Sequence, residues 1–198
     1  GGDAEDLDYL IENVAIATVG DVMELENENR IFVKEGLQML KRTHSPGLRS
    51  LIACTGVDKD RIGAYDIGFV LGPCMNASGR LDTAKRTLNL LRAKSGKEAD
   101  ILAGDLKALN DSRKEMTDIA VEQARQIVDT TKAGKDRVLV LYLPGCHESL
   151  AGIVAGRIRE RYYRPAIILT DAEEGIKGSG RSIEAYNMYE ELSRCKDL

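Results

Sequence analysis

A glycine-rich segment near the C-terminus, residues 175–182, carries side chains that could hold a phosphate group. Its sequence is Gly-Ile-Lys-Gly-Ser-Gly-Arg-Ser, and its glycines would let a ligand come close to the backbone N–H groups. The segment offers four side-chain donors: Lys177, Ser179, Arg181 and Ser182. In a strand, alternate side chains share a face, which places the first three together. The glycine spacing fits neither a P-loop nor a dinucleotide-binding fingerprint, so we expect an anion site of another kind. The alternative is a glycine-rich strand end with ordinary polar residues.

A second segment, residues 144–152, follows a buried apolar run and leads into a helix, where α/β folds place ligands. It contains His147, which could donate to a phosphate or act as a general acid. The alternative is an ordinary loop histidine, but the helix start beside it favours an anion site. Cys146 is adjacent, yet neighbouring residues seldom orient as nucleophile and base, so we do not expect a Cys–His dyad.

A third segment, residues 72–80, contains Asn76 and Arg80. It lies within a glycine-rich stretch, residues 63–79, which predicts a shaped loop. We expect a helix over residues 83–93 to follow this loop. The polar side chains would then form a cluster on a rigid connection.

A fourth candidate is Asp21, which ends an apolar helical run over residues 15–21. A carboxylate at the end of a buried element needs a compensating partner, and a metal ion is one of the few that compensate fully. The alternative is an ordinary helix-terminal aspartate.

Helical periodicity dominates the chain up to about residue 130. Three shorter helices are expected over residues 7–19, 31–40 and 48–55. A longer helix begins at the capping box Ser95-Gly-Lys-Glu98 and continues for about 30 residues, roughly 45 Å. We interpret it as a helix that joins two domains. A dimeric coiled coil is the alternative, although Arg113 and Gln123 lie on its apolar seam.

The pattern changes after Gly134 to alternating strands and helices. Strand, helix, strand, strand and helix are expected over residues 138–143, 149–162, 165–170, 176–182 and 188–195. A strand–helix–strand order implies a right-handed crossover and a parallel strand pair. The predicted fold class is therefore α/β, with a mostly helical first part, a long connector helix and a small mixed sheet.

The composition is that of a globular chain. Of 198 residues, 43% are hydrophobic, and 28 basic against 32 acidic residues give a net charge of −4. A disordered chain is excluded, and the apolar runs fall short of the ~20 residues of a membrane span. The charge argues against a broad basic surface for nucleic acid. However, residues 1–66 hold 13 acidic and 7 basic residues, whereas residues 67–135 hold 9 and 12. Four scattered cysteines predict reduced thiols and a cytoplasmic location.

The order of the four segments closely resembles the RecJ family, single-strand-specific 5′-to-3′ DNA exonucleases of the DHH phosphoesterase superfamily. The similar stretches are residues 17–25, 67–81, 147–158 and 177–182. The resemblance covers nearly the whole chain. It implies the C-terminal part of a DHH domain at 1–94, a connector helix at 95–134 and an incomplete DHHA1 domain at 135–198.

The resemblance also implies roles for the candidate residues. Asp21 matches the last metal-binding aspartate of a DHH domain, which holds Mn²⁺ or Mg²⁺. Asn76 and Arg80 match an Asn-Ala-x-Gly-Arg motif near the active cleft, and His147 matches a DHHA1 histidine. The implied phosphate-binding residues are Ser179, Arg181 and Ser182, to which Lys177 is added on its own chemistry.

The implied activity is metal-dependent hydrolysis of single-stranded DNA in repair and recombination, by a monomer without membrane contact. A single-strand binding protein and a helicase are the implied partners. The chain lacks the Asp-His-His motif, which we expect upstream of Gly1 together with the family's Asp-x-Asp motif, and Cys146-His147-Glu148-Ser149 stands where many relatives have Trp-His-Pro-Gly. We therefore expect an internal fragment that is inactive alone, since one carboxylate cannot hold two metal ions.

Three other functions remain open from the sequence. One is a phosphodiesterase for short oligonucleotides or cyclic dinucleotides, and another is a noncatalytic scaffold of the same fold. The third is a helical oligomerisation module built on residues 96–131, which would form a concentration-dependent dimer.

Overall fold

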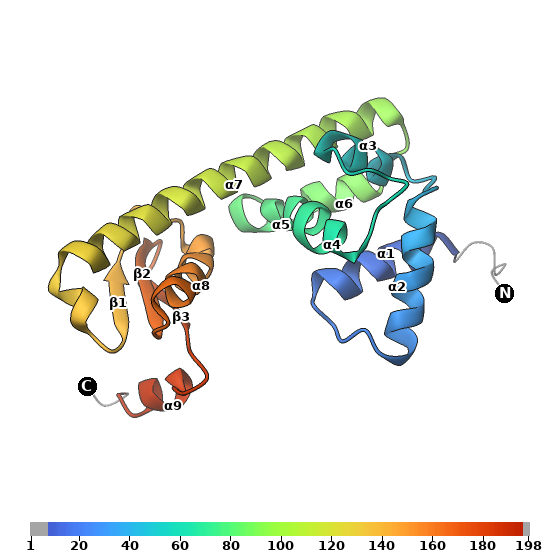
Figure 1. The fold of residues 1–198 in the computed structure, drawn as a ribbon. Coiled ribbons are helices and arrows are strands. Elements are labelled where there is room, and N and C mark those ends of the chain that lie inside the picture. The colour runs from blue at the N-terminus through green and yellow to red at the C-terminus, as the bar shows by residue number, and fades with distance from the viewer. Residues whose placement is uncertain (1–7, 196–198) are drawn as a thin grey trace. The chain divides into compact units, whose positions relative to one another are not determined.

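The computed structural model describes residues 8–195. The chain divides into two compact units, Gly1–Asp111 and Ser112–Leu198, and the division falls within the long helix α7 (Gly96–Thr130) (Figure 1). The first unit is helical, and the second combines helices with a three-stranded sheet. The predicted fold class is confirmed. Within the described residues, no helix combines the length and the apolar character that crossing a membrane requires.

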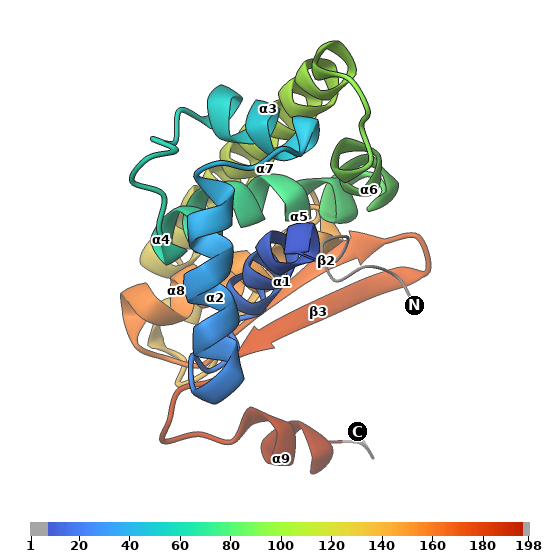
Figure 2. The ribbon, with the colours of Figure 1, turned by 90° about the vertical axis from the view of Figure 1, so that its right-hand side faces the viewer.

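The first unit is a packed group of helices. In chain order they are α1 (Asp8–Gly20), α2 (Asn27–Leu40), α3 (Pro46–Thr55), α4 (Ala64–Asp66), α5 (Gly72–Leu81), α6 (Lys85–Leu91) and the start of α7. Their fully buried leucines, among them Leu51, Leu90 and Leu106, belong to one core. α1 and α2 lie side by side (Figure 2). Gly36 permits this approach because a Cβ at that position would collide with the Cβ of Ala15.

Local signals place the ends of two helices. Ser45 caps α3, its Oγ accepting a hydrogen bond from the N–H of Leu48 at 3.3 Å, and Gly56 ends the helix at φ +73°. At the start of α7, Ser95 Oγ accepts from the N–H of Glu98 at 3.3 Å. The Ser95 half of the predicted capping box is therefore present, whereas Glu98 Oε2 accepts from the N–H of Lys94 at 3.3 Å and not from that of Ser95.

The loop predicted over residues 63–79 is wrong. The structure has a continuous helical run there: α4, the π-helical turn η2 (Ile67–Leu71) and α5. Glycine serves packing in this run, because a Cβ on Gly72 would lie 2.8 Å from the carbonyl oxygen of Ile67. Burial of Ile67 and Leu71 in the core stabilises the helical form more than glycine destabilises it.

The second unit contains a small mixed sheet. Its elements are the rest of α7, η3 (Lys132–Lys135), β1 (Leu139–Tyr142), η4 (Glu148–Leu150), α8 (Ala151–Tyr162), β2 (Ala166–Ala172), β3 (Gly175–Arg181) and α9 (Met188–Ser193). β1 pairs with β2 in parallel and β2 with β3 antiparallel, in the order β1-β2-β3. α8 is the crossover between β1 and β2, as the strand–helix–strand pattern predicts. The core joins α7, α8 and the sheet through side chains such as Ala124, Val154 and Ile168.

Candidate functional site

Two phosphate-binding candidates on β3 converge on the first turn of α8. Ser179 pairs with Ile168 and Arg181 with Ala166, so both occupy the face of the sheet whose β2 residues are buried. A Cβ placed on Gly152 of α8 would lie 2.9 Å from Ser179 Oγ and 2.8 Å from Arg181 Nη2. The predicted shared face is confirmed, and the two side chains meet at the start of a helix.

The glycines of β3 have a different purpose from the one predicted. Gly178 and Gly180 point to the opposite face, where a Cβ would lie 2.8 Å from Leu169 Cδ2 or collide with Met188 Sδ. Packing against these side chains explains both glycines. Close approach of a ligand to the backbone, the role we predicted for these glycines, is therefore not required to explain why they are glycines.

The N-terminus of α8 adds a positive electrostatic potential to this site. α8 continues directly from η4, which His147 caps through its side chain, and the N–H of Ala151 bonds to the carbonyl oxygen of Glu148. The first N–H groups of a helix and its dipole favour an anion. The hydroxyl of Ser179 and the guanidinium of Arg181 therefore lie where a phosphate oxygen would find charge-assisted donors.

His147 lies just before this helix start and is exposed. Its Nδ1 accepts a hydrogen bond from the N–H of Ser149 at 3.3 Å and lies 2.8 Å from Ser149 Oγ. Because Nδ1 accepts from the backbone, the neutral ring carries its proton on Nε2. His147 can thus donate outward through Nε2, and Ser149 is the residue that sets this tautomer.

Cys146 does not form a catalytic pair with His147. The thiol is buried, and its Sγ is directed at the carbonyl oxygen of His147 at 3.6 Å rather than at the imidazole. Burial raises the pKa of the Cys146 thiol. A neutral, enclosed thiol agrees with the sequence argument against a Cys–His dyad.

A small pocket of about 270 Å³ lies beside these residues. Its lining includes Ser149, Thr170, Lys177 and Ser179. Glu148 also lines it, and Glu148 Oε2 forms an ion pair with Lys177 Nζ at 2.8 Å. This pair lowers the pKa of Glu148 and raises that of Lys177, in both cases through the hydrogen bond between them. The ammonium group of Lys177, which we predicted to bind phosphate, is therefore already paired with the carboxylate of Glu148.

Ser182 is engaged elsewhere. Its hydroxyl donates to the carbonyl oxygen of Tyr186 in the connection between β3 and α9. This bond stabilises the turn that leads to α9. A contact between Ser182 and phosphate stays a prediction.

Asn76 and Arg80 lie four residues apart on α5, and both are exposed. Residues at this spacing share a helix face. Ser78 between them is buried and its Oγ lies 3.0 Å from Thr87 Oγ1, a contact that ties α5 to α6. Asn76 and Arg80 thus form a pair in the first unit, while His147, Ser179 and Arg181 group together in the second.

Asp21 does not form a metal site with its described neighbours. It follows α1 and is exposed, not enclosed as a buried carboxylate would be. Across residues 8–195 there is no group of three or more His, Cys, Asp or Glu side chains that could hold a metal ion. The described residues alone therefore do not hold a divalent metal ion, and a metal role for Asp21 stays a prediction.

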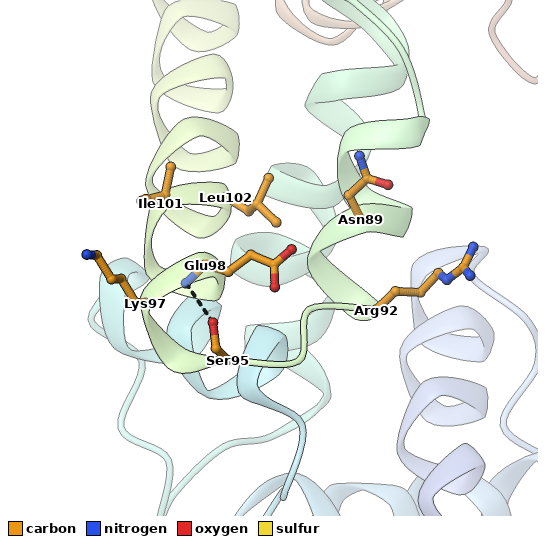
Figure 3. A pocket seen from close by; sticks show the side chains of 7 residues that line it. All are labelled: Asn89, Arg92, Ser95, Lys97, Glu98, Ile101 and Leu102. Carbon is orange, nitrogen blue, oxygen red and sulfur yellow. Dashed lines mark hydrogen bonds between the residues drawn. The ribbon is translucent and has the colours of Figure 1, made fainter.

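A larger hollow of about 520 Å³ in the first unit holds none of the predicted residues. It lies between the end of α6 and the start of α7, with Asn89 and Arg92 on one side and Glu98 and Leu102 on the other (Figure 3). Basic, acidic and apolar side chains all line it. We assign it no ligand.

Comparisons with known proteins agree with the motifs. No family model matches the chain. The chain is 38% identical to the single-stranded-DNA-specific exonuclease RecJ of Bacillus subtilis (strain 168), covering 96% of this chain and 24% of the relative. For RecJ of Escherichia coli (strain K12) the identity is 37%, covering 96% and 34%. The chain thus spans about a quarter to a third of the length of these curated relatives.

Solved structures show the same correspondence. The crystal structure of RecJ from Thermus thermophilus in complex with Mg²⁺ superposes with a TM-score of 0.83 at 30% identity, covering 96% of this chain and 29% of that one. A RecJ structure bound to manganese gives a TM-score of 0.76 at 31% identity, covering 92% and 46%. The resemblance predicted from the four motifs is confirmed.

Proposed function

Because the chain is similar over nearly its whole length to a segment of the RecJ exonucleases, we propose that it forms part of a nuclease that degrades single-stranded DNA from the 5′ end. In this proposal, residues 1–94 belong to a DHH domain, 95–134 to a connector helix and 135–198 to a DHHA1 domain. The protein would act in DNA repair and recombination, as a cytoplasmic monomer. A single-strand binding protein and a helicase are its proposed partners.

The observation that carries the proposal is the convergence of Ser179 and Arg181 on Gly152. A strand phosphate at the start of α8 would receive hydrogen bonds from the Ser179 hydroxyl and the Arg181 guanidinium. Such a contact reads the backbone and not the base, so it serves an enzyme that acts on any sequence. His147 would donate to the same or a neighbouring phosphate through Nε2. Asn76 and Arg80 would contact the strand from the first unit.

Binding the catalytic metal ions would require more ligands than the described residues supply. RecJ from Thermus thermophilus has been crystallised with Mg²⁺ and with Mn²⁺. Bound divalent ions would polarise the phosphate and supply a metal-activated water. Asp21 would be one ligand, but it has no cluster of described partners. We therefore assign strand binding, and no hydrolytic step, to this chain.

One competing function has a specific observation in its favour. The lack of a metal cluster among residues 8–195 also suits a noncatalytic protein that binds nucleic acid. The phosphodiesterases for short oligonucleotides or cyclic dinucleotides are a further alternative.

Binding and hydrolysis measured on the same chain separate these functions. We expect fluorescence anisotropy to show that a labelled single strand binds more tightly than the matching duplex. With Mn²⁺ or Mg²⁺ added, we expect no release of nucleotides from the single strand by this chain alone. Equal binding of strand and duplex would contradict the proposal, and hydrolysis of a cyclic dinucleotide would favour the alternative enzyme.

A further inference from the structure

Two aromatic rings in the first unit are stacked on each other and stay in solvent. Tyr65 and Phe69 have ring centroids 4.8 Å apart and an interplanar angle of 26°. Their side chains are 69% and 68% exposed. Large aromatic side chains normally bury most of their surface. A stacked pair that stays exposed is therefore unusual on a surface that has no binding partner.

The rings lie on the continuous helical run that also carries Asn76 and Arg80 (Figure 1). Tyr65 and Phe69 are four residues apart, one helical turn. Asn76 and Arg80 follow Phe69 by seven and eleven residues, close to two and three turns, which places the four side chains on one side of the run to within about a quarter turn. The helical rise puts Asn76 about 10 Å and Arg80 about 16 Å beyond Phe69.

The helical run that carries these four side chains contains a backbone feature common at functional sites. The π-helical turn Ile67–Leu71 contains Phe69, and the N–H of Gly72 bonds to the carbonyl oxygen of Ile67. A π turn inserted in an α-helix shifts the side chains on either side of it and is often found where a protein binds a ligand. Here Ile67 and Leu71 are buried while Phe69 is turned outward.

We propose that Tyr65 and Phe69 form a stacking platform for a base of single-stranded nucleic acid whose backbone passes Asn76 and Arg80. The proposal rests on the proposed function and adds a base-binding surface to it. Every nucleobase has a flat π face, so aromatic stacking holds a strand without selecting its sequence. That is what an enzyme acting on any single strand requires.

The charges near the rings favour a base over a phosphate or an acidic peptide. Asp66 lies between the two aromatic residues in sequence, and its Oδ2 accepts a hydrogen bond from the N–H of Gly63 at 2.9 Å. Residues 1–66 are acidic as a whole. A neutral base tolerates this field, whereas an anionic group placed on the rings would be repelled.

The test compares a strand with bases and the same strand with abasic sites. We expect Phe69→Ala and Phe69→Leu to weaken binding of the base-bearing strand about 5- to 100-fold, the range for loss of one stacked base. Binding of the abasic strand should stay within about twofold of the wild type. Phe69→Trp should retain the wild-type affinity, and a 2-aminopurine placed in the strand should be quenched on binding by the wild type and by Phe69→Trp only.

Two controls separate this inference from the proposed function. Phe32→Leu removes the other phenylalanine of the first unit, which is 42% exposed, and should leave both affinities unchanged. Arg181→Ala should weaken both strands alike, because it removes a phosphate contact. Wild-type affinity in Phe69→Leu, or equal losses for base-bearing and abasic strands, would overturn the platform while leaving the phosphate site intact. A wild-type chain that bound neither strand would overturn the proposed function and the platform together.

Discussion

Glu148 Oε2 lies 2.8 Å from Lys177 Nζ, so an ion pair joins the turn before α8 to β3 across the pocket that contains Ser179. Both side chains are well exposed, and such a pair contributes little to folding. The ion pair matters instead for binding of the strand phosphate. The carboxylate neutralises Lys177, which lines the same pocket as Ser179, and places a negative charge beside the expected phosphate.

We therefore expect Glu148→Gln to raise affinity for single-stranded DNA by about two- to fivefold at low salt, since it removes a repulsive charge and releases Lys177. Anisotropy titrations at two salt concentrations would measure the gain, which should shrink as salt increases. Glu160→Gln on α8, a glutamate paired with Arg159, is the matched charge control. An equal gain in both variants would mean that net charge, and not the pocket, sets the affinity.

Arg181→Ala should weaken binding of single-stranded DNA about 10- to 100-fold, the cost of losing one charge-assisted phosphate contact. The loss should be the same for all sequences, and the slope of log affinity against log salt should fall by about one. Arg137→Ala removes the same charge from an exposed position before β1 and should change affinity much less. Identical salt slopes in the two variants would contradict the phosphate role of Arg181.

Glu12 gives the fold a pH dependence. It is 4% exposed in α1, and its Oε1 accepts a hydrogen bond from Thr43 Oγ1 at 2.9 Å. Burial raises the pKa of Glu12, and the Thr43 hydrogen bond opposes that rise only in part. Since the folded pKa is above the unfolded value near 4.5, this residue's contribution to stability is complete below that value and is lost as pH rises through the folded pKa.

Glu12→Gln should remove this contribution to the pH dependence. We expect the wild type to lose stability relative to Glu12→Gln as the pH rises above about 4.5 and through the raised pKa of Glu12, because only the wild type must bury a charge. Urea unfolding followed by circular dichroism at several pH values would measure the difference. Glu35→Gln, at an exposed position on α2, is the control. Parallel stability curves for the wild type and Glu12→Gln would contradict the prediction.

Hydrophobic periodicity and helix-capping signals predicted the elements whose local sequence preference matches the structure that packing stabilises. The parallel pair β1 and β2 follows from two apolar runs around a helix, and the start of α7 follows from Ser95 and Glu98. The helical run through Gly72 was missed because glycine and proline dominate local propensity there. Burial of Ile67 and Leu71 decides the structure instead, and that burial depends on helices distant in sequence.

The site was predictable only in part for the same reason. Alternation along β3 was enough to place Ser179 and Arg181 on one face. The ion pair between Glu148 and Lys177 joins two elements, and no spacing within either one signals it. The exposure of Asp21 likewise depends on how α1 packs, which an apolar run alone does not determine.

Gly152→Ala tests whether the approach of β3 to α8 makes the phosphate site. The new Cβ would lie 2.8 Å from Arg181 Nη2 and 2.9 Å from Ser179 Oγ, so both side chains must move from the helix start. We expect single-strand affinity to fall at least as far as in Arg181→Ala. Because the contacts are the far ends of flexible side chains, the thermal midpoint should change little.

Gly156→Ala on the same helix provides the control. A Cβ there meets no atom within 4 Å, and replacing a mid-helix glycine stabilises by about 0.5–1 kcal/mol. This variant should melt at a higher temperature and bind the strand as the wild type does. If Gly152→Ala also kept wild-type affinity, the phosphate would have to bind away from the start of α8, and the roles given to Ser179 and Arg181 would both be wrong.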